Sequence, residues 1–116
     1  MEAVLMNNLK VLYVEDDSLT RMMMKKQLKD LFGTFNDAEN GSVGLEKFKS
    51  MKPDVIVTDI SMQVMNGYEM IKCIRELDDN VKIIVTTAHT EHDDKLTGCT
   101  IIRKPINISE LIKSIH

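Results

Sequence analysis

A buried-strand pattern ends in a single carboxylate near the middle of the chain. Residues 55–58 form an uninterrupted apolar and β-branched run, the pattern of a strand that is covered on both faces in a parallel sheet. Asp59 follows directly, and the loop after it leads to Gly67, where a helical pattern begins. Ligands of open α/β sheets bind beyond the carboxyl ends of the strands, so Asp59 is a candidate functional residue. The alternative is an aspartate that only caps the following turn.

The remainder of the chain alternates short apolar runs with amphipathic stretches. The predicted strands are residues 10–14, 34–38, 55–58, 82–87 and 100–103. The first predicted helix spans residues 18–32 and ends at Gly33 in a left-handed conformation, and a second, short helix is capped by Asn40. A third spans residues 67–77, with Leu77 on its buried face. The last begins at the capping box Asn107-x-x-Glu110. This alternation predicts a doubly wound α/β fold around a parallel sheet, with helices on both faces.

Composition favours one aliphatic core. With 116 residues, 43% hydrophobic and 4% aromatic, the chain has the size of one domain, and we expect residues 1–8 to form an extension and residues 9–116 the core. The net charge of −3, without a basic stripe, argues against direct binding of nucleic acid or an anionic membrane. No stretch approaches the roughly 20 apolar residues that span a bilayer, so we expect a cytoplasmic location. Cys73 and Cys99 lack metal-ligand spacing and are expected to be reduced.

Charged and hydroxyl side chains stand at the ends of four predicted strands. They are Glu15 and Asp16, Asp59, Thr87, and Lys104. Three carboxylates at one sheet edge repel one another unless a cation joins them, and oxygen ligands with room for water suit Mg²⁺. Lys104 would pair with a carboxylate at rest and with a phosphoryl oxygen after reaction, while Thr87 supplies a hydroxyl and the small Ala88 lets a backbone N–H approach. Each residue taken alone also fits a solvated turn.

Together, Glu15-Asp16, Asp59, Thr87-Ala88 and Lys104-Pro105 resemble the receiver domain of bacterial two-component response regulators, the CheY-like family, over residues 10–115. The resemblance implies a five-stranded sheet in the order 2-1-3-4-5. It also implies one receiver domain that takes a phosphoryl group on Asp59 from a histidine kinase or a histidine phosphotransfer protein, and so changes its binding of a downstream protein. Such a domain is an enzyme only for its own phosphorylation and dephosphorylation.

The same resemblance assigns roles to individual residues. Asp16 and Asp59 would ligate Mg²⁺ directly with the main-chain carbonyl of Ser61, and Glu15 would act through water. Thr87 and Lys104 would contact the phosphoryl group, and the Lys104-Pro105 bond is expected to be cis. Asp17 is expected not to be a ligand.

Three departures from the family pattern affect the expected signal. Gln63 replaces a proline in the loop after Asp59, and Ile101 replaces an aromatic residue. The segment between residues 88 and 104 is shorter than usual by about one helical turn, so we expect a shortened fourth helix between residues 88 and 100. Met22 and Met23 are expected to be partly exposed. They either form a docking surface or simply pack against neighbouring helices.

Other classes of protein remain as alternatives. A haloacid-dehalogenase-like phosphatase would need an acid where Ser61 stands, and a flavodoxin-like cofactor binder would not place three acids after its first strand. His89, His92 and Asp93 suggest a metal site, although a solvated loop fits them better. A pseudo-receiver that binds partners without phosphotransfer, or a receiver cut from a longer regulator, also stays open.

Overall fold

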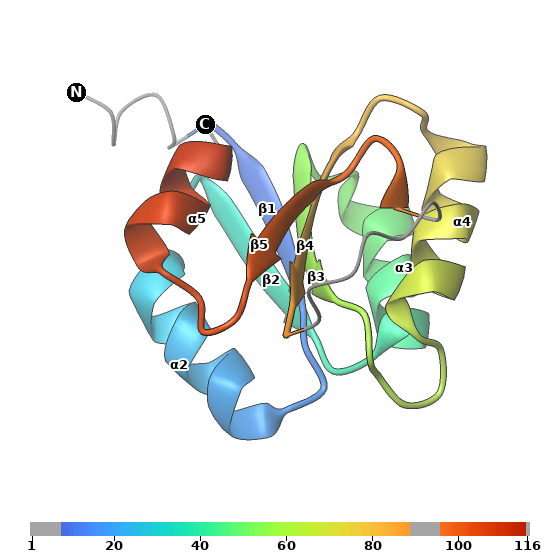
Figure 1. Cartoon of the computed structure of the whole chain (residues 1–116). Helices are drawn as coiled ribbons and strands as arrows, with labels where there is room; N and C mark the ends of the chain where they lie inside the picture. The colour runs from blue at the N-terminus through green and yellow to red at the C-terminus, as the bar shows by residue number, and fades with distance from the viewer. Residues whose placement is uncertain (1–7, 89–95, 116) are drawn as a thin grey trace.

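The computed structural model describes residues 8–88 and 96–115, which form a parallel sheet between two pairs of helices (Figure 1). The strands are β1 Lys10–Val14, β2 Thr34–Ala38, β3 Val55–Asp59, β4 Lys82–Thr87 and β5 Thr100–Arg103. The helices are α2 Ser18–Leu28, α3 Gly41–Met51, α4 Gly67–Leu77 and α5 Ile108–Ile115. All four strand pairs are parallel, and the order is β2-β1-β3-β4-β5. The doubly wound fold and the strand order predicted from the sequence are confirmed.

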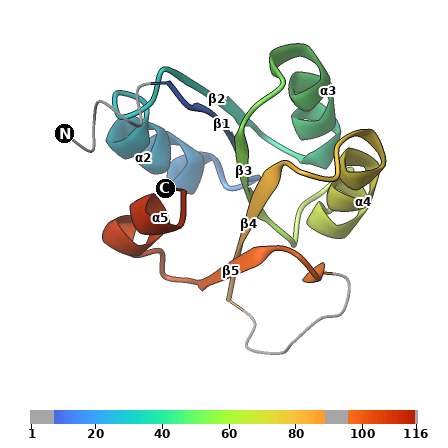
Figure 2. The same cartoon turned by 90° about the horizontal axis from the view of Figure 1, so that it is seen from above.

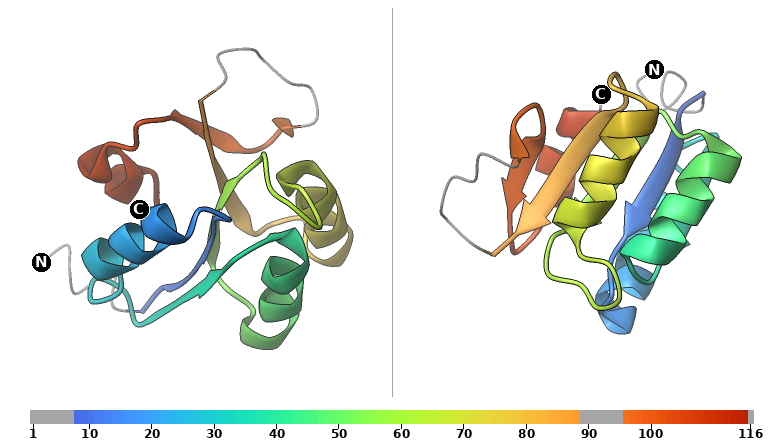
Figure 3. Two further views of the ribbon diagram at one scale, coloured as in Figure 1. Left: turned by 90° about the horizontal axis from the view of Figure 1, so that it is seen from below. Right: turned by 90° about the vertical axis from the view of Figure 1, so that its right-hand side faces the viewer.

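The two faces of the sheet carry separate cores. Helices α2 and α5 cover one face, and α3 and α4 cover the other, as the view along the sheet shows (Figure 2) and the side view of α3 and α4 supports (Figure 3). Successive residues of β1 serve opposite faces: Val11 and Tyr13 pack toward α2 and α5, while Leu12 and Val14 pack toward α3 and α4. This double burial explains why the central strands are continuously apolar.

Side-chain caps set the starts of the four helices. In each case a side-chain oxygen one position before the helix accepts a backbone N–H from the first turn. The pairs are Asp17 with Thr20 at 2.9 Å, Asn40 with Val43 at 2.9 Å, Asn66 with Glu69 at 3.0 Å, and Asn107 with Glu110 at 3.0 Å. The predicted caps Asn40 and Asn107 are therefore confirmed, and Asp17 serves as a cap.

Two helix predictions were wrong. Residues 18–32 do not form one helix, because α2 ends at Leu28 and the chain then turns, with the Leu31 N–H bonded to the Leu28 carbonyl at 3.0 Å. The turn lets Thr34 reach the Leu9 carbonyl at 3.2 Å and start β2, and Gly33 needs no left-handed conformation. Leu77 is 57% exposed, because it ends α4 beyond the last turn that packs on the sheet.

The predicted short fourth helix lies largely in residues 89–95, outside the described part of the chain, as do His89, His92 and Asp93. The described end of this connection is held by a backbone hydrogen bond and by packing. The Cys99 N–H donates to the Leu96 carbonyl at 3.0 Å, and the Leu96 side chain is buried. Cys73 and Cys99 are free thiols, as expected. None of the helices seen in residues 8–88 and 96–115 has the length and apolarity that a membrane crossing needs.

Candidate functional site

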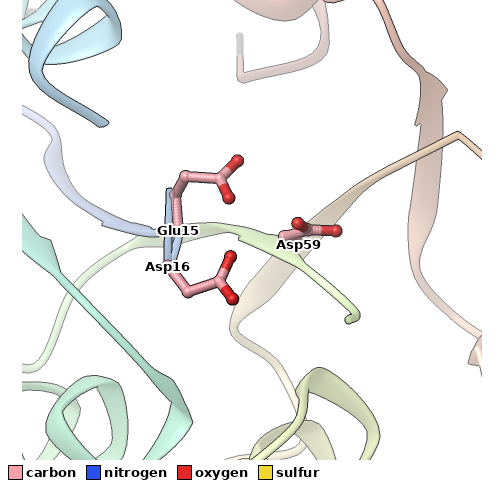
Figure 4. Close-up of side chains that lie close together, drawn as sticks. All are labelled: Glu15, Asp16 and Asp59. Atoms are coloured by element: carbon pink, nitrogen blue, oxygen red, sulfur yellow. The ribbon is translucent and has the colours of Figure 1, made fainter. Parts of the chain in front are cut away.

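Three carboxylates converge at the carboxyl ends of β1 and β3. The oxygens that Glu15, Asp16 and Asp59 offer lie within 4.8 Å of one another (Figure 4). The register explains this convergence, because Val14 of β1 pairs with Thr58 of β3 and the next residues along both strands therefore lie side by side. The sequence prediction that these three acids lie together at one edge of the sheet is confirmed.

Lys104 bridges two of these acids. Its Nζ lies 3.0 Å from Asp59 Oδ2 and 3.2 Å from Glu15 Oε1. Its backbone N–H donates to the Thr87 carbonyl at 2.8 Å, which anchors Lys104 at the end of β5, and the Lys104-Pro105 bond is cis, as predicted. Burial alone would lower the pKa of Lys104, but the hydrogen bonds and the charges of Asp59 and Glu15 outweigh it and raise the pKa. The side chain is therefore an ammonium at neutral pH.

Glu15 is held from several sides and is only 1% exposed. Its N–H donates to the Ala38 carbonyl at 3.0 Å, and its carboxylate accepts the Asp17 N–H at 3.2 Å in addition to Lys104. Burial is the main effect on its pKa, which is raised; the Asp17 N–H and Lys104 oppose the rise, and the charge of Asp59 adds to it. A buried carboxylate beside two others has a strong requirement for a positive partner.

Asp59 lies against the start of α4. Its Oδ1 accepts the Ile60 N–H at 2.7 Å, and the Gly67 N–H donates to the Ile60 carbonyl at 2.8 Å. A Cβ on Gly67 would lie 2.5 Å from the Asp59 carbonyl oxygen, so only glycine allows α4 to begin this close to β3. Gly67 therefore fixes the position of the Asp59 main chain.

The other predicted site residues surround this cluster. Thr87 is 8% exposed and ends β4, one residue beyond Thr86, which pairs with Asp59 in the sheet. Ala88 follows it and is exposed. Ser61 is exposed and, with Asp16, lines a hollow of about 370 Å³ beside the acids. The structure thus places Glu15, Asp16, Asp59 and Lys104 in direct proximity, and Thr87, Ala88 and Ser61 on adjoining segments.

Two features near the site were missed by the sequence analysis. The guanidinium of Arg21 donates to the Glu15 main-chain oxygen at 2.8 Å and pairs with Asp37 at 3.3 Å. The Tyr13 hydroxyl is buried, with no hydrogen-bond partner among the described residues, and its pKa is raised by burial and then by the charges of Glu15 and Asp59. Hydrophobic periodicity does not detect the position of a charged residue. Arg21, one turn into the helix that follows the acidic turn, was therefore missed.

The loop after Asp59 contains a strained residue. Val64 has a φ of 69°, and the Met65 N–H donates to the Gln63 carbonyl at 2.8 Å, so Val64 is the central residue of a γ-turn with positive φ. A β-branched side chain rarely adopts this conformation. The turn is held in place because the Met65 carbonyl accepts the Gly41 N–H at 3.0 Å.

The donor set suits Mg²⁺. All three converging side chains offer carboxylate oxygens, which are the hard ligands that this ion prefers. Lys104 supplies one positive charge against three carboxylates, so the cluster keeps an excess of negative charge that a divalent cation would offset.

Comparison with known proteins identifies the family. The family model of the response regulator receiver domain matches residues 11–116, so the chain belongs to this family, whose members are receiver modules of two-component signalling. The Thermotoga maritima chemotaxis protein CheY is 42% identical over 80 residues, which are 68% of this chain and 67% of that protein. The Bacillus subtilis sporulation initiation phosphotransferase F is 30% identical over 112 residues, which are 91% of this chain and 90% of that protein.

Solved structures and longer relatives agree with this assignment. A chain in the co-crystal structure of the Saccharomyces cerevisiae histidine phosphotransfer signaling protein Ypd1 and the receiver domain of its downstream response regulator Ssk1 is 26% identical, with a TM-score of 0.84, over 95% of this chain and 88% of that one. Two protein-glutamate methylesterase/protein-glutamine glutaminases, from Desulfotalea psychrophila and Clostridium acetobutylicum, are 33% and 38% identical over 79% of this chain but only 26% and 27% of their own lengths. The match therefore spans only about a quarter of the length of those longer proteins.

Proposed function

We propose that this chain is a phosphoacceptor receiver of a two-component phosphorelay, and that Asp59 accepts a phosphoryl group from a phosphohistidine of a kinase or a histidine phosphotransfer protein. One observation carries the proposal: the Lys104 ammonium lies 3.0 Å from Asp59 and 3.2 Å from Glu15, within a cluster of three carboxylates. A lysine held by two acids at the end of a parallel sheet is in position to pair with new negative charge on Asp59.

The chemistry is a displacement at phosphorus. An Asp59 carboxylate oxygen forms the new O–P bond, the N–P bond of the phosphohistidine breaks, and the imidazole leaves and takes up a proton. Lys104 then exchanges its carboxylate partner for a phosphoryl oxygen, and the Thr87 hydroxyl and the backbone N–H of the small, exposed Ala88 donate to the others. Attack of water on phosphorus later restores the Asp59 carboxylate, so the chain would act only on itself.

The acidic cluster would hold Mg²⁺. Asp16, Asp59 and the main-chain oxygen of Ser61 would be its ligands, and Glu15 would act through water. When bound, the ion offsets the charge that the carboxylates and phosphoryl oxygens bring together. The chain's own part is to hold these oxygens in place, and for Glu15 the contacts of its N–H with Ala38 and of its carboxylate with the Asp17 N–H do so.

Small-molecule phosphodonors test the proposal without a partner protein. Acetyl phosphate with Mg²⁺ should add one phosphoryl group to the wild-type chain, as read from the intact mass, and chelation of the metal should prevent the addition. Asp59→Asn should remove the adduct, while Asp54→Asn, at an exposed acid that bonds the Lys10 N–H at 2.8 Å away from the cluster, should retain it. A wild-type chain without an adduct would contradict the proposal and favour a pseudo-receiver.

The exposed side of α2 is the proposed docking site for the phosphohistidine partner. Leu19, Met22 and Met23 are 59%, 50% and 50% exposed, which confirms the expected exposure of the two methionines. A groove of about 310 Å³ next to them is lined by Thr20, Met23, Gln27, Lys104, Pro105 and Ile108. The groove thus joins an apolar surface to the reactive lysine, and flexible methionines suit an adaptable interface. The Ypd1–Ssk1 complex supports a partner of this class.

A double substitution separates docking from chemistry. Met22→Gln with Met23→Gln should slow transfer from a cognate phosphohistidine protein by about tenfold, which corresponds to about 1.4 kcal/mol lost from the two side chains together. Phosphorylation by acetyl phosphate should stay unchanged. The matched control is Leu77→Gln, which alters a similarly exposed apolar residue at the end of α4. Equal slowing with both donors would contradict a docking role.

A further inference from the structure

Arg21 connects three segments that meet behind the acidic cluster. From α2, its Nη1 donates to the Glu15 main-chain oxygen at 2.8 Å, and its Nε lies 3.3 Å from Asp37 Oδ2 on β2. Both Arg21 and Asp37 side chains are 20% exposed, so this pair is largely withdrawn from solvent. The guanidinium therefore ties the turn after β1 to the neighbouring strand.

The two contacts match the fork of an arginine side chain. Two different nitrogens of one planar group serve two acceptors on different segments, whereas a lysine ammonium is a single point without this fixed spacing. The Glu15 main chain is then held at both polar atoms, since its N–H already donates to the Ala38 carbonyl at 3.0 Å. Because Asp16 is the next residue, the same contacts limit where both carboxylates of the turn point.

If Arg21 acted only through its positive charge, its removal would change Mg²⁺ binding in the opposite direction to the loss of a positioning contact. The positive charge of Arg21 lies next to the turn that carries Glu15 and Asp16, because its Nη1 is 2.8 Å from the Glu15 main-chain oxygen. A positive charge there repels Mg²⁺, so its removal alone should tighten metal binding. If Arg21 instead holds the carboxylates in place, its removal should weaken metal binding, and the sign of the change separates the two roles.

We propose that Arg21 is a positioning residue of the metal-binding turn, which acts through the Glu15 main-chain oxygen and does not itself contact the metal or the phosphoryl group. The inference rests on the proposed function, because it concerns the same Mg²⁺ site. Partners of metal ligands that do not touch the metal themselves commonly change metal affinity by about 10- to 100-fold, and we expect an effect at the lower end of this range.

Calorimetric titration of the unphosphorylated protein with MgCl₂ measures the effect directly. Arg21→Gln should bind Mg²⁺ about tenfold more weakly than wild type. Arg21→Lys keeps the charge but not the fork, and should also bind more weakly. The matched control is Lys25→Gln, which removes a cation 3.5 Å from the same Asp37 without any contact to Glu15, and its affinity should stay within about twofold of wild type.

A kinetic readout distinguishes positioning from general damage. With acetyl phosphate as donor, the Mg²⁺ concentration for half-maximal rate should rise with the dissociation constant, while the rate at saturating Mg²⁺ should stay within about twofold of wild type. Circular dichroism checks the fold, and if Arg21→Gln does not fold, the milder Arg21→Lys carries the measurement. Wild-type or tighter Mg²⁺ binding by a folded Arg21 variant would overturn this inference but leave the proposed function standing. Absence of Mg²⁺ binding by the wild type would instead overturn the proposed function.

Discussion

Replacement of Lys104 by methionine removes the ammonium from the acidic cluster and retains most of the aliphatic side chain. Loss of one partner from a buried ion pair costs about 3–5 kcal/mol. The Glu15 side chain is 1% exposed, but that of Lys104 is 28% exposed, so solvent screens part of this cost. We therefore expect Lys104→Met to lower the free energy of unfolding by about 2 kcal/mol at neutral pH without Mg²⁺.

The loss should depend on pH in a defined direction. Burial already raises the pKa of Glu15, and removal of Lys104 raises it further. An acid whose pKa is higher in the folded state holds a proton that the unfolded chain releases, so stability falls as pH rises from the unfolded value of about 4.3 through the folded value. Lys104→Met should accordingly be less destabilising at about pH 5 than at about pH 7.

Urea unfolding followed by circular dichroism measures both effects. The variant should regain stability when millimolar Mg²⁺ is added, because the ion supplies the missing positive charge and binds only the folded cluster. The conservative control is Lys113→Met on α5, whose charge is not paired with the cluster. A Lys104 variant as stable as wild type at neutral pH without Mg²⁺, or one whose loss grows toward acid pH, would refute this reasoning.

Three further substitutions test individual features. Tyr13→Phe should raise the free energy of unfolding by about 1 kcal/mol, since a buried hydroxyl without a partner is costly; a drop in stability would show that the hydroxyl has a partner. Val64→Asn should raise the melting temperature, because the positive φ costs asparagine about 1 kcal/mol less than it costs valine. The Val64 side chain is 82% exposed, so its replacement loses no packing. An unchanged or lower melting temperature would argue against strain. Gly67→Ala should cost about 2 kcal/mol and slow phosphorylation by acetyl phosphate, because the new Cβ displaces the Asp59 main chain; wild-type stability and rate would contradict the close contact.

The strand pattern was sufficient to predict the sheet. Strands buried on both faces are short and β-branched, and four of the five strand ranges agree with the structure, while β3 extends one residue further, to Asp59. The end of α2 could not be predicted, because the apolar pattern continues to Phe32, which is buried although it lies in a turn. Leu77 follows the helical period but lies past the part of the sheet that α4 covers.

The acidic cluster was predictable because parallel strands bring their carboxyl ends to one edge, which places Asp59 beside Glu15 and near Lys104. The contacts of Arg21 were not predictable from the sequence. Its ion pair with Asp37 depends on the pairing of β1 with β2 and on the rotation of α2 about its axis. The strain at Val64 likewise arises from tertiary contacts of its neighbours and not from its own preference. The cytoplasmic location and the assignment of residues 1–116 to one receiver domain stay predictions.

Chemical trapping of the phosphorylated residue tests the central proposal most directly. Borohydride reduces an acyl phosphate on aspartate to homoserine, and peptide mass mapping then locates the modified position. After treatment with acetyl phosphate and Mg²⁺, we expect homoserine at Asp59 alone, and none when Mg²⁺ is chelated. Homoserine at Asp16 or at another acid, or no conversion in a folded and Mg²⁺-loaded protein, would contradict Asp59 as the phosphoacceptor.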